Sequence, residues 1–186
     1  MPAENARKDT RVVELAQQVQ EAVTAIRGES SFEPEIGIVL GTGLNALADR
    51  IDVAARISYE RIPHFPRATA HTHAGELLLG RLGGRPVVAL SGRFHFYEGY
   101  ALRQVTFPIR VAKALGIHAL VVSNAAGGLN PQFAAGDLMV ITDHINFMGH
   151  NPLIGPNEDA LGPRFPDMCE PYANDLIALA ESVALA

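Results

Sequence analysis

Three short apolar runs place the strongest constraint on how this chain can fold. They cover residues 36–40, 119–122 and 138–141, and apart from Gly37 every residue in them is hydrophobic. A strand that is apolar on both faces needs cover on both faces, as the inner strands of an α/β sheet have. We therefore expect all three runs to be buried strands of one sheet.

Segments with helical periodicity alternate with these runs. Apolar residues recur at intervals of three and four over residues 12–26 and again over 102–115, which predicts two amphipathic helices. Residues 172–186 are expected to be helical as well, after a long proline-containing loop at 151–171. Strands that alternate with helices predict an α/β sheet with helices on both faces.

A β-hairpin is predicted in the first half of the chain. Strand patterns over residues 76–82 and 85–90 flank Gly83 and Gly84, and two glycines supply the positive φ angles that a tight turn needs. Residues 53–59 are expected to form a further strand.

Composition and charge exclude several classes of protein. The 186 residues are 48% hydrophobic and 19% charged, as in a folded domain, and the net charge of −5 gives no general attraction for nucleic acid or membrane. No apolar run resembles a signal peptide or a membrane span, so we expect a cytoplasmic protein. Cys169 is the only cysteine, which excludes an internal disulfide.

The stretch Gly41-Thr42-Gly43-Leu44-Asn45-Ala46 follows the first apolar run. It fits the GxGxxA pattern of nicotinamide-dinucleotide sites, with Glu60 at about the spacing of a ribose-binding acid. That alternative stays open, although the helix expected at residues 44–51 is short and nothing downstream suggests hydride transfer. The other interpretation is a phosphate contact, in which the Thr42 hydroxyl acts beside backbone donors.

Arg, His, Tyr and Glu are concentrated in the stretch Ser91-Gly92-Arg93-Phe94-His95-Phe96-Tyr97-Glu98-Gly99-Tyr100. The Arg93 guanidinium is a planar fork that suits two phosphate oxygens. In an extended segment His95 projects to the same side and can share the anion. The alternative is a surface ion pair between Arg93 and Glu98.

A Gly-rich turn follows the second apolar run. Residues 124–128 read Asn-Ala-Ala-Gly-Gly, and in open α/β sheets ligands collect at the carboxyl edge of the strands. Exposed N–H groups there can hold an anion, and two small Ala side chains leave space for a flat group such as a base. An ordinary turn is the alternative.

His71 and His73 raise the possibility of a metal site, because alternate histidines on a strand can bind zinc. No nearby carboxylate or cysteine completes a ligand set. We therefore expect no metal, and we assign His73 a polar contact beside Gly75.

Taken together, these motifs resemble the trimeric class of purine nucleoside phosphorylases. The likeness runs from about residue 36 to residue 172 through these motifs: Gly41-Thr42-Gly43-Leu44, Ile62-Pro63-His64-Phe65-Pro66, His73-Ala74-Gly75, residues 92–100, Thr106-Phe107-Pro108, residues 124–131, Asp143-His144-Ile145-Asn146 and Gly162-Pro163-Arg164-Phe165-Pro166.

The resemblance implies a fold, an activity and partners. The fold is a nucleoside phosphorylase-type mixed central sheet with helices on both faces. The activity is reversible phosphorolysis of purine ribo- and deoxyribonucleosides, which yields the free base and the sugar 1-phosphate in purine salvage. It further implies a homotrimer that needs no cofactor, because inorganic phosphate is a co-substrate.

The resemblance also implies roles for individual residues. The phosphate ligands are Thr42, His73, Arg93, His95 and the backbone of Ala125, and of these Arg93 and His95 are catalytic. The ribose contacts are Tyr97 and, from a neighbouring subunit, Phe165. The base pocket includes Ala126 and Gly127.

In this family the Glu and Asn that bind the purine, a ribose-packing Met and a His near the 5′-hydroxyl lie beyond the point that matches Ala186. We therefore expect residues 1–186 to be a single truncated phosphorylase domain, with the sheet incomplete at the C-terminus and little turnover from this chain alone. A methylthioadenosine phosphorylase and an inert phosphate-binding remnant remain alternatives.

Overall fold

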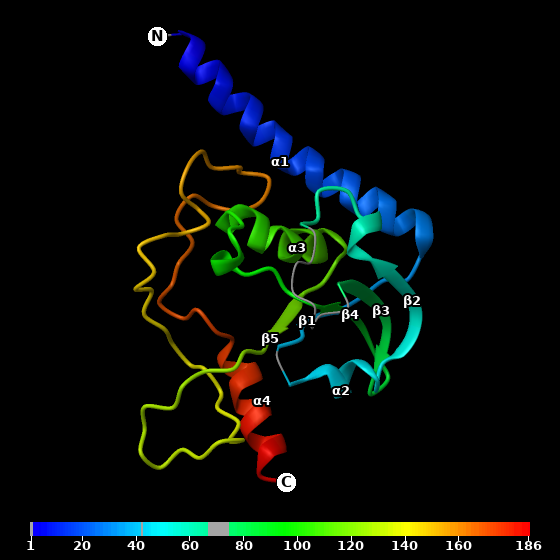
Figure 1. The fold of residues 1–186 in the computed structure, drawn as a ribbon, viewed down its shortest axis with the longest axis vertical. Helices are drawn as coiled ribbons and strands as arrows, with labels where there is room; N and C mark the ends of the chain where they lie inside the picture. The colour runs from blue at the N-terminus through cyan, green and yellow to red at the C-terminus, as the bar shows by residue number, and fades with distance from the viewer. Residues whose placement is uncertain (1, 42, 67–74) are drawn as a thin grey trace.

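The computed structural model describes residues 2–41, 43–66 and 75–186 (Figure 1). Its elements are, in chain order, α1 (Pro2–Glu29), β1 (Ile36–Val39), α2 (Asn45–Ala48), β2 (Asp52–Ser58), the 3₁₀ turn η1 (Tyr59–Arg61), β3 (Glu76–Leu82), β4 (Arg85–Ser91), the 3₁₀ turn η2 (Phe96–Glu98), α3 (Leu102–Ala114), β5 (Ala119–Val122) and α4 (Asn174–Ala184).

The described strands form one mixed sheet in the order β2-β3-β4-β1-β5. β1 is parallel to both β4 and β5, whereas β2, β3 and β4 are joined by antiparallel pairing. Gly83 and Gly84, with φ of 56° and 80°, form the turn between β3 and β4. The predicted hairpin, the strand at residues 53–59 and the α/β class are therefore confirmed.

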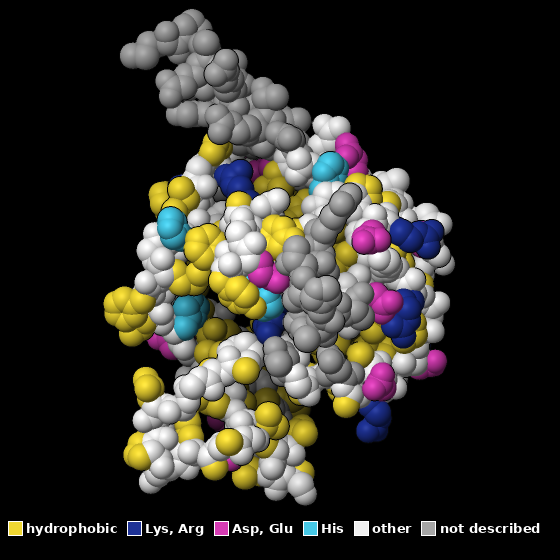
Figure 2. Space-filling model, in the orientation of Figure 1, with side chains coloured by type: hydrophobic (Ala, Val, Ile, Leu, Met, Phe, Trp, Pro, Cys, Tyr) yellow, Lys and Arg dark blue, Asp and Glu magenta, His cyan; other side chains and the backbone are white. Residues whose placement is uncertain are grey.

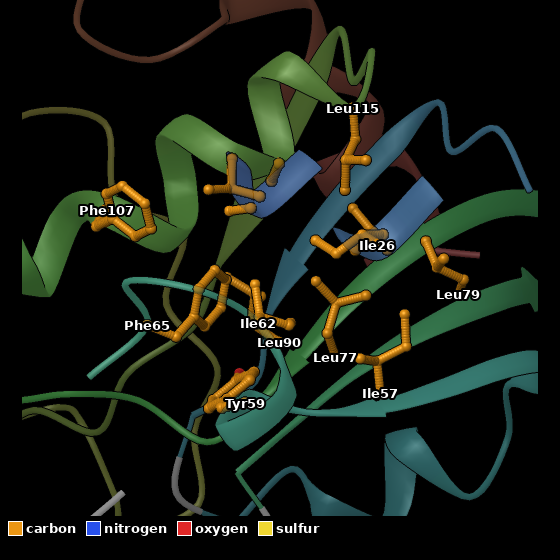
Figure 3. Close-up of a cluster of buried hydrophobic side chains, with 14 of the residues drawn as sticks. Ile26, Ile57, Tyr59, Ile62, Phe65, Leu77, Leu79, Leu90, Phe107 and Leu115 are labelled. Atoms are coloured by element: carbon orange, nitrogen blue, oxygen red, sulfur yellow. The ribbon is translucent and has the colours of Figure 1, made fainter. Parts of the chain in front are cut away.

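The larger core lies between the sheet and two helices. Figure 3 shows Leu77, Leu79 and Leu90 of the sheet facing Ile26 of α1 and Leu115, which follows α3. Val19, Ala22 and Ile26 recur at helical spacing and are fully buried, so α1 packs through one apolar stripe. This core fixes the face of the sheet that α1 and α3 cover.

A smaller core covers the opposite face. It consists of Ile38, Leu40, Ile51, Leu78, Val87 and Ala89, with Leu47 and Ala48 of α2 packed against it. Figure 1 shows α2 on the side of the sheet away from α1 and α3. Neighbouring residues of β1 and β4 thus enter different cores, as expected of strands that are apolar on both faces.

The predicted strand at residues 138–141 is wrong. All of residues 123–173 are described, and they contain no helix or strand; Leu138 is 96% exposed. β5 pairs with β1 along one edge, and no described strand pairs with its other edge. The prediction that β5 is buried is also incorrect, since Val122 is 56% exposed.

The helix boundaries differ from the predictions in smaller ways. α1 extends back to Pro2, α2 is a single turn, and α4 begins at Asn174. No helix among the described residues is long and apolar enough to span a bilayer.

Gly80 in β3 provides a test of this sheet. A Cβ on Gly80 would overlap the carbonyl oxygen of Asp52 in the neighbouring strand β2, whereas a Cβ on Gly28 of α1 would meet no atom within 4 Å. We expect Gly80→Ala to lower the free energy of unfolding by about 1–3 kcal/mol through overpacking. Gly28→Ala should raise it by about 0.5–1 kcal/mol through helix propensity. Urea unfolding measures both, and equal stabilities would contradict the pairing described here.

Candidate functional site

The carboxyl ends of three parallel strands meet at one edge of the sheet. Val39 of β1 lies opposite Leu90 of β4 and Val122 of β5. The residues that follow these strands are therefore neighbours, although they are far apart in sequence. The predicted motifs at residues 41–46, 91–100 and 123–131 all begin here.

Ser123 joins the ends of β1 and β5. Its hydroxyl accepts a hydrogen bond from the Gly41 N–H at 2.8 Å and donates to the Val39 carbonyl at 3.0 Å. A Cβ on Gly41 would lie only 2.6 Å from the Ser123 carbonyl oxygen. Glycine is therefore required at position 41 by a close backbone approach.

Arg93 reaches the same junction from the end of β4. Its Nη1 donates to the Ser123 carbonyl oxygen at 2.9 Å, and the residue is half-buried. Its Nε is buried and has no hydrogen-bond partner among the described residues. The arrangement holds a permanent positive charge at the strand edge with donor capacity that the described part of the chain does not use.

Tyr59 fixes the backbone just before Arg93. Its hydroxyl donates to the Gly92 carbonyl oxygen at 2.9 Å, and its ring packs 5.4 Å from that of Phe94. Phe94 is buried in the core, whereas Arg93 and His95 on either side of it are half-buried. Burial, with a smaller effect from Glu76, raises the pKa of Tyr59.

His95 is held by Glu98. A Glu98 carboxylate oxygen accepts from the His95 N–H at 2.7 Å and lies 3.2 Å from Nδ1 of the ring. A carboxylate there favours a proton on Nδ1. Glu98 reaches back because η2 turns the chain through 3₁₀ geometry and ends at Gly99, which has φ of 93°. Glu98 thus contacts His95 through both the backbone and the ring.

Tyr97 is stacked on His95 with ring centroids 4.8 Å apart and is 81% exposed. Its ring is thus placed against His95 and is open to solvent. This position is compatible with contact to a bound sugar, the role predicted for it.

Ala125, Ala126 and Gly127 come two to four residues after Ser123 and are exposed. The Asn124 side-chain amide donates to the Ala125 carbonyl oxygen at 3.1 Å. The structure thus brings the predicted base-pocket residues to the sheet edge that holds Arg93.

Phe165 is not joined to this cluster by any described contact. It is 85% exposed, and the Arg164 guanidinium lies 5.7 Å from its ring centroid. Thr42, His71 and His73 lie outside the described residues. The phosphate contacts predicted for Thr42 and His73, and the metal interpretation of His71, therefore stay sequence-based.

Two other predictions concern metals and dinucleotides. Among the described residues there is no group of three or more His, Cys, Asp or Glu side chains that could hold a metal ion. The helix after the GxGxxA motif has only four residues, and no side-chain hydrogen bond from Leu44 caps it. It is much shorter than the helix that follows a dinucleotide-binding turn.

Sequence reasoning missed the roles of Ser123 and Tyr59. Ser123 is the first polar residue after a strand, and the register of β5 against β1 was the information needed to notice it. The sequence around Tyr59 gives no comparable signal, because its hydrogen-bond partner is a backbone carbonyl, that of Gly92, which is distant in the sequence.

The Tyr59 hydrogen bond gives a prediction about stability and pH. We expect Tyr59→Phe to lower the free energy of unfolding by about 1–3 kcal/mol at pH 7, because the buried Gly92 carbonyl loses its donor. The folded state keeps the phenol proton at a pH where the unfolded chain, with a pKa near 10, releases it. The wild-type advantage is therefore present below about pH 10 and shrinks above it by up to about 1.4 kcal/mol per pH unit.

Urea unfolding at pH 7 and pH 10.5 measures this difference. Tyr97→Phe is the matched control, since it removes the same hydroxyl from an exposed ring and should change stability at pH 7 by less than about 0.5 kcal/mol. A Tyr59→Phe protein as stable as wild type at pH 7 would show that the hydrogen bond to Gly92 contributes nothing.

Comparison with known proteins identifies the family. Residues 35–186 match the phosphorylase superfamily. Purine nucleoside phosphorylase 1 of Bacillus subtilis is 55% identical over 170 residues, which are 91% of this chain and 63% of that protein. Purine nucleoside phosphorylase of Bos taurus is 46% identical over 88% of this chain and 57% of its own length.

Solved structures agree with the sequence comparison. A crystal structure of isoform 2 of purine nucleoside phosphorylase from Schistosoma mansoni, in complex with cytosine and ribose-1-phosphate, superposes with a TM-score of 0.86 at 43% identity; the match covers 91% of this chain and 60% of that one. This chain spans about three-fifths of the length of these relatives. The predicted nucleoside phosphorylase-type fold is confirmed, and the chain belongs to the phosphorylase superfamily.

Proposed function

We propose that this protein is a purine nucleoside phosphorylase, which converts purine ribo- and deoxyribonucleosides and inorganic phosphate reversibly into free base and sugar 1-phosphate. The observation that carries the proposal is the Arg93 guanidinium, bound to the Ser123 carbonyl at the strand edge with its Nε unpartnered among the described residues. The relatives named purine nucleoside phosphorylase support the substrate class.

The chemistry explains why a fixed cation is needed. Phosphorolysis separates a sugar with oxocarbenium character from a departing purine anion. A phosphate dianion held in place both attacks the sugar and stabilises its charge. In this proposal Arg93 and His95 hold the dianion, and Glu98 orients the His95 ring through Nδ1.

The other predicted phosphate ligands complete the site in the same proposal. Thr42 and His73 contribute side chains, and Ala125 contributes its backbone N–H. Ala125 lies two residues after Ser123, at the edge that Arg93 occupies. In this proposal inorganic phosphate is the co-substrate, and we assign no cofactor.

The sugar and base contacts involve exposed side chains. We assign Tyr97 to the ribose and Ala126 and Gly127 to the base. Phe165 is assigned to the ribose site of a neighbouring subunit in a homotrimer. Its 85% exposure leaves it accessible for such a role, and Figure 2 shows further hydrophobic side chains at the surface of the part of the molecule that contains residues 124–173 and α4. Burial of apolar surface against other chains is a common basis of oligomers. We further propose that the protein acts in the cytoplasm, in purine salvage.

Substitution of Arg93 tests this function. In the full-length protein, assayed with inosine or guanosine and phosphate, Arg93→Met should lower kcat/KM for phosphate by about 100-fold or more, because a charge-assisted contact to the dianion is lost. Arg81→Met is the control: Arg81 binds the Gly84 carbonyl at the far end of the same hairpin, and its loss should leave kinetics unchanged.

Three results would contradict the proposal. Phosphorolysis of methylthioadenosine in preference to inosine would indicate the related phosphorylase instead. Phosphate binding without turnover of any nucleoside would indicate an inert remnant. Wild-type kinetics of the Arg93→Met protein would show that Arg93 does not bind phosphate.

A further inference from the structure

We propose that Ser123 is a positioning residue for the phosphate site, and that its hydroxyl sets phosphate affinity without touching phosphate itself. The inference rests on the proposed function, since it concerns the same anion. The hydroxyl makes hydrogen bonds at the ends of β1 and β5 that the backbone of this strand pair cannot make.

The described backbone hydrogen bonds between the ends of β1 and β5 stop at Ser123. The Ser123 N–H donates to the Val39 carbonyl at 3.3 Å, which is the last backbone hydrogen bond described between the two strand ends. Beyond it the Gly41 N–H faces β5, and the Ser123 hydroxyl accepts from it at 2.8 Å. The side chain therefore extends the ladder by one hydrogen bond.

A hydroxyl serves as donor and acceptor at once. Ser123 donates to Val39 at 3.0 Å while it accepts from Gly41. These two bonds tie the Ser123 side chain to Val39, the last residue of β1, and to Gly41, two residues further along the chain. An alanine offers neither bond and would leave a partly buried N–H unpaired.

Ser123 also contacts the Arg93 guanidinium, through its carbonyl oxygen. The Ser123 carbonyl oxygen that receives Arg93 Nη1 at 2.9 Å is also the atom that a Cβ on Gly41 would approach to 2.6 Å. A shift of the Ser123 backbone would thus move the acceptor of the guanidinium and disturb the close approach to Gly41. One residue therefore links the Arg93 guanidinium to the chain that leaves β1.

The test compares Ser123→Thr with Ser123→Val in the full-length protein. The two replacements have nearly the same shape, and only threonine keeps the hydroxyl. We expect KM for phosphate to stay within about twofold of wild type for Thr and to rise about tenfold for Val, the loss typical of one hydrogen bond. The kcat at saturating phosphate should change by less than about threefold in both, because Ser123 does not touch the reacting atoms.

Ser30→Ala is the control for general destabilisation. The Ser30 hydroxyl also accepts from a partly buried backbone N–H, that of Phe32 at 3.2 Å, but it precedes β1 at the opposite edge of the sheet. Its loss should lower the melting temperature without changing KM for phosphate. Melting temperatures of all variants, measured with and without inorganic phosphate, give a binding signal that does not depend on turnover.

The outcomes separate this inference from the proposed function. Equal phosphate KM values for Ser123→Thr and Ser123→Val would overturn the inference and leave the function intact. Unfolding of Ser123→Val even in saturating phosphate would show a purely structural hydroxyl and would also overturn it. Failure of the wild-type protein to bind or use phosphate would overturn the proposed function, and the inference with it.

Discussion

The parallel pairing of β1 with β4 and β5 is the constraint on which the rest of this structure depends. Parallel strands end at the same edge of the sheet, so the residues that follow them lie close together in space although they are far apart in the sequence. Gly41, Arg93 and Ser123 meet in this way through hydrogen bonds of 2.8 and 2.9 Å. The two hydrophobic cores on the faces of the sheet hold the strands in this register.

The second constraint is electrostatic. The chain has a net charge of −5, so long-range attraction of an anion is unfavourable and any phosphate must be held locally. Arg93 is half-buried, stays charged throughout the physiological pH range, and keeps one donor unused by the described residues. Burial weakens the screening of this charge by salt and therefore strengthens its attraction for a bound anion.

Much of this fold could be predicted, because apolar periodicity and glycine turns are local signals. The hairpin at Gly83-Gly84 and helix α3 are where those signals place them. Residues 138–141 have the composition of a strand and are not one, because a strand needs a partner and no described strand pairs with the second edge of β5. The same absence explains why Val122 is exposed.

Sequence alone determined the chemistry that is available: a guanidinium, an imidazole with a carboxylate three residues away, and small residues after apolar runs. Tertiary structure decided which of these groups meet. The Ser123 carbonyl binds Arg93 from 30 positions away, and the Ser123 hydroxyl binds Gly41 from 82 positions away. Side-chain identity is encoded residue by residue, whereas contacts at such separations exist only after strand register brings distant backbone together.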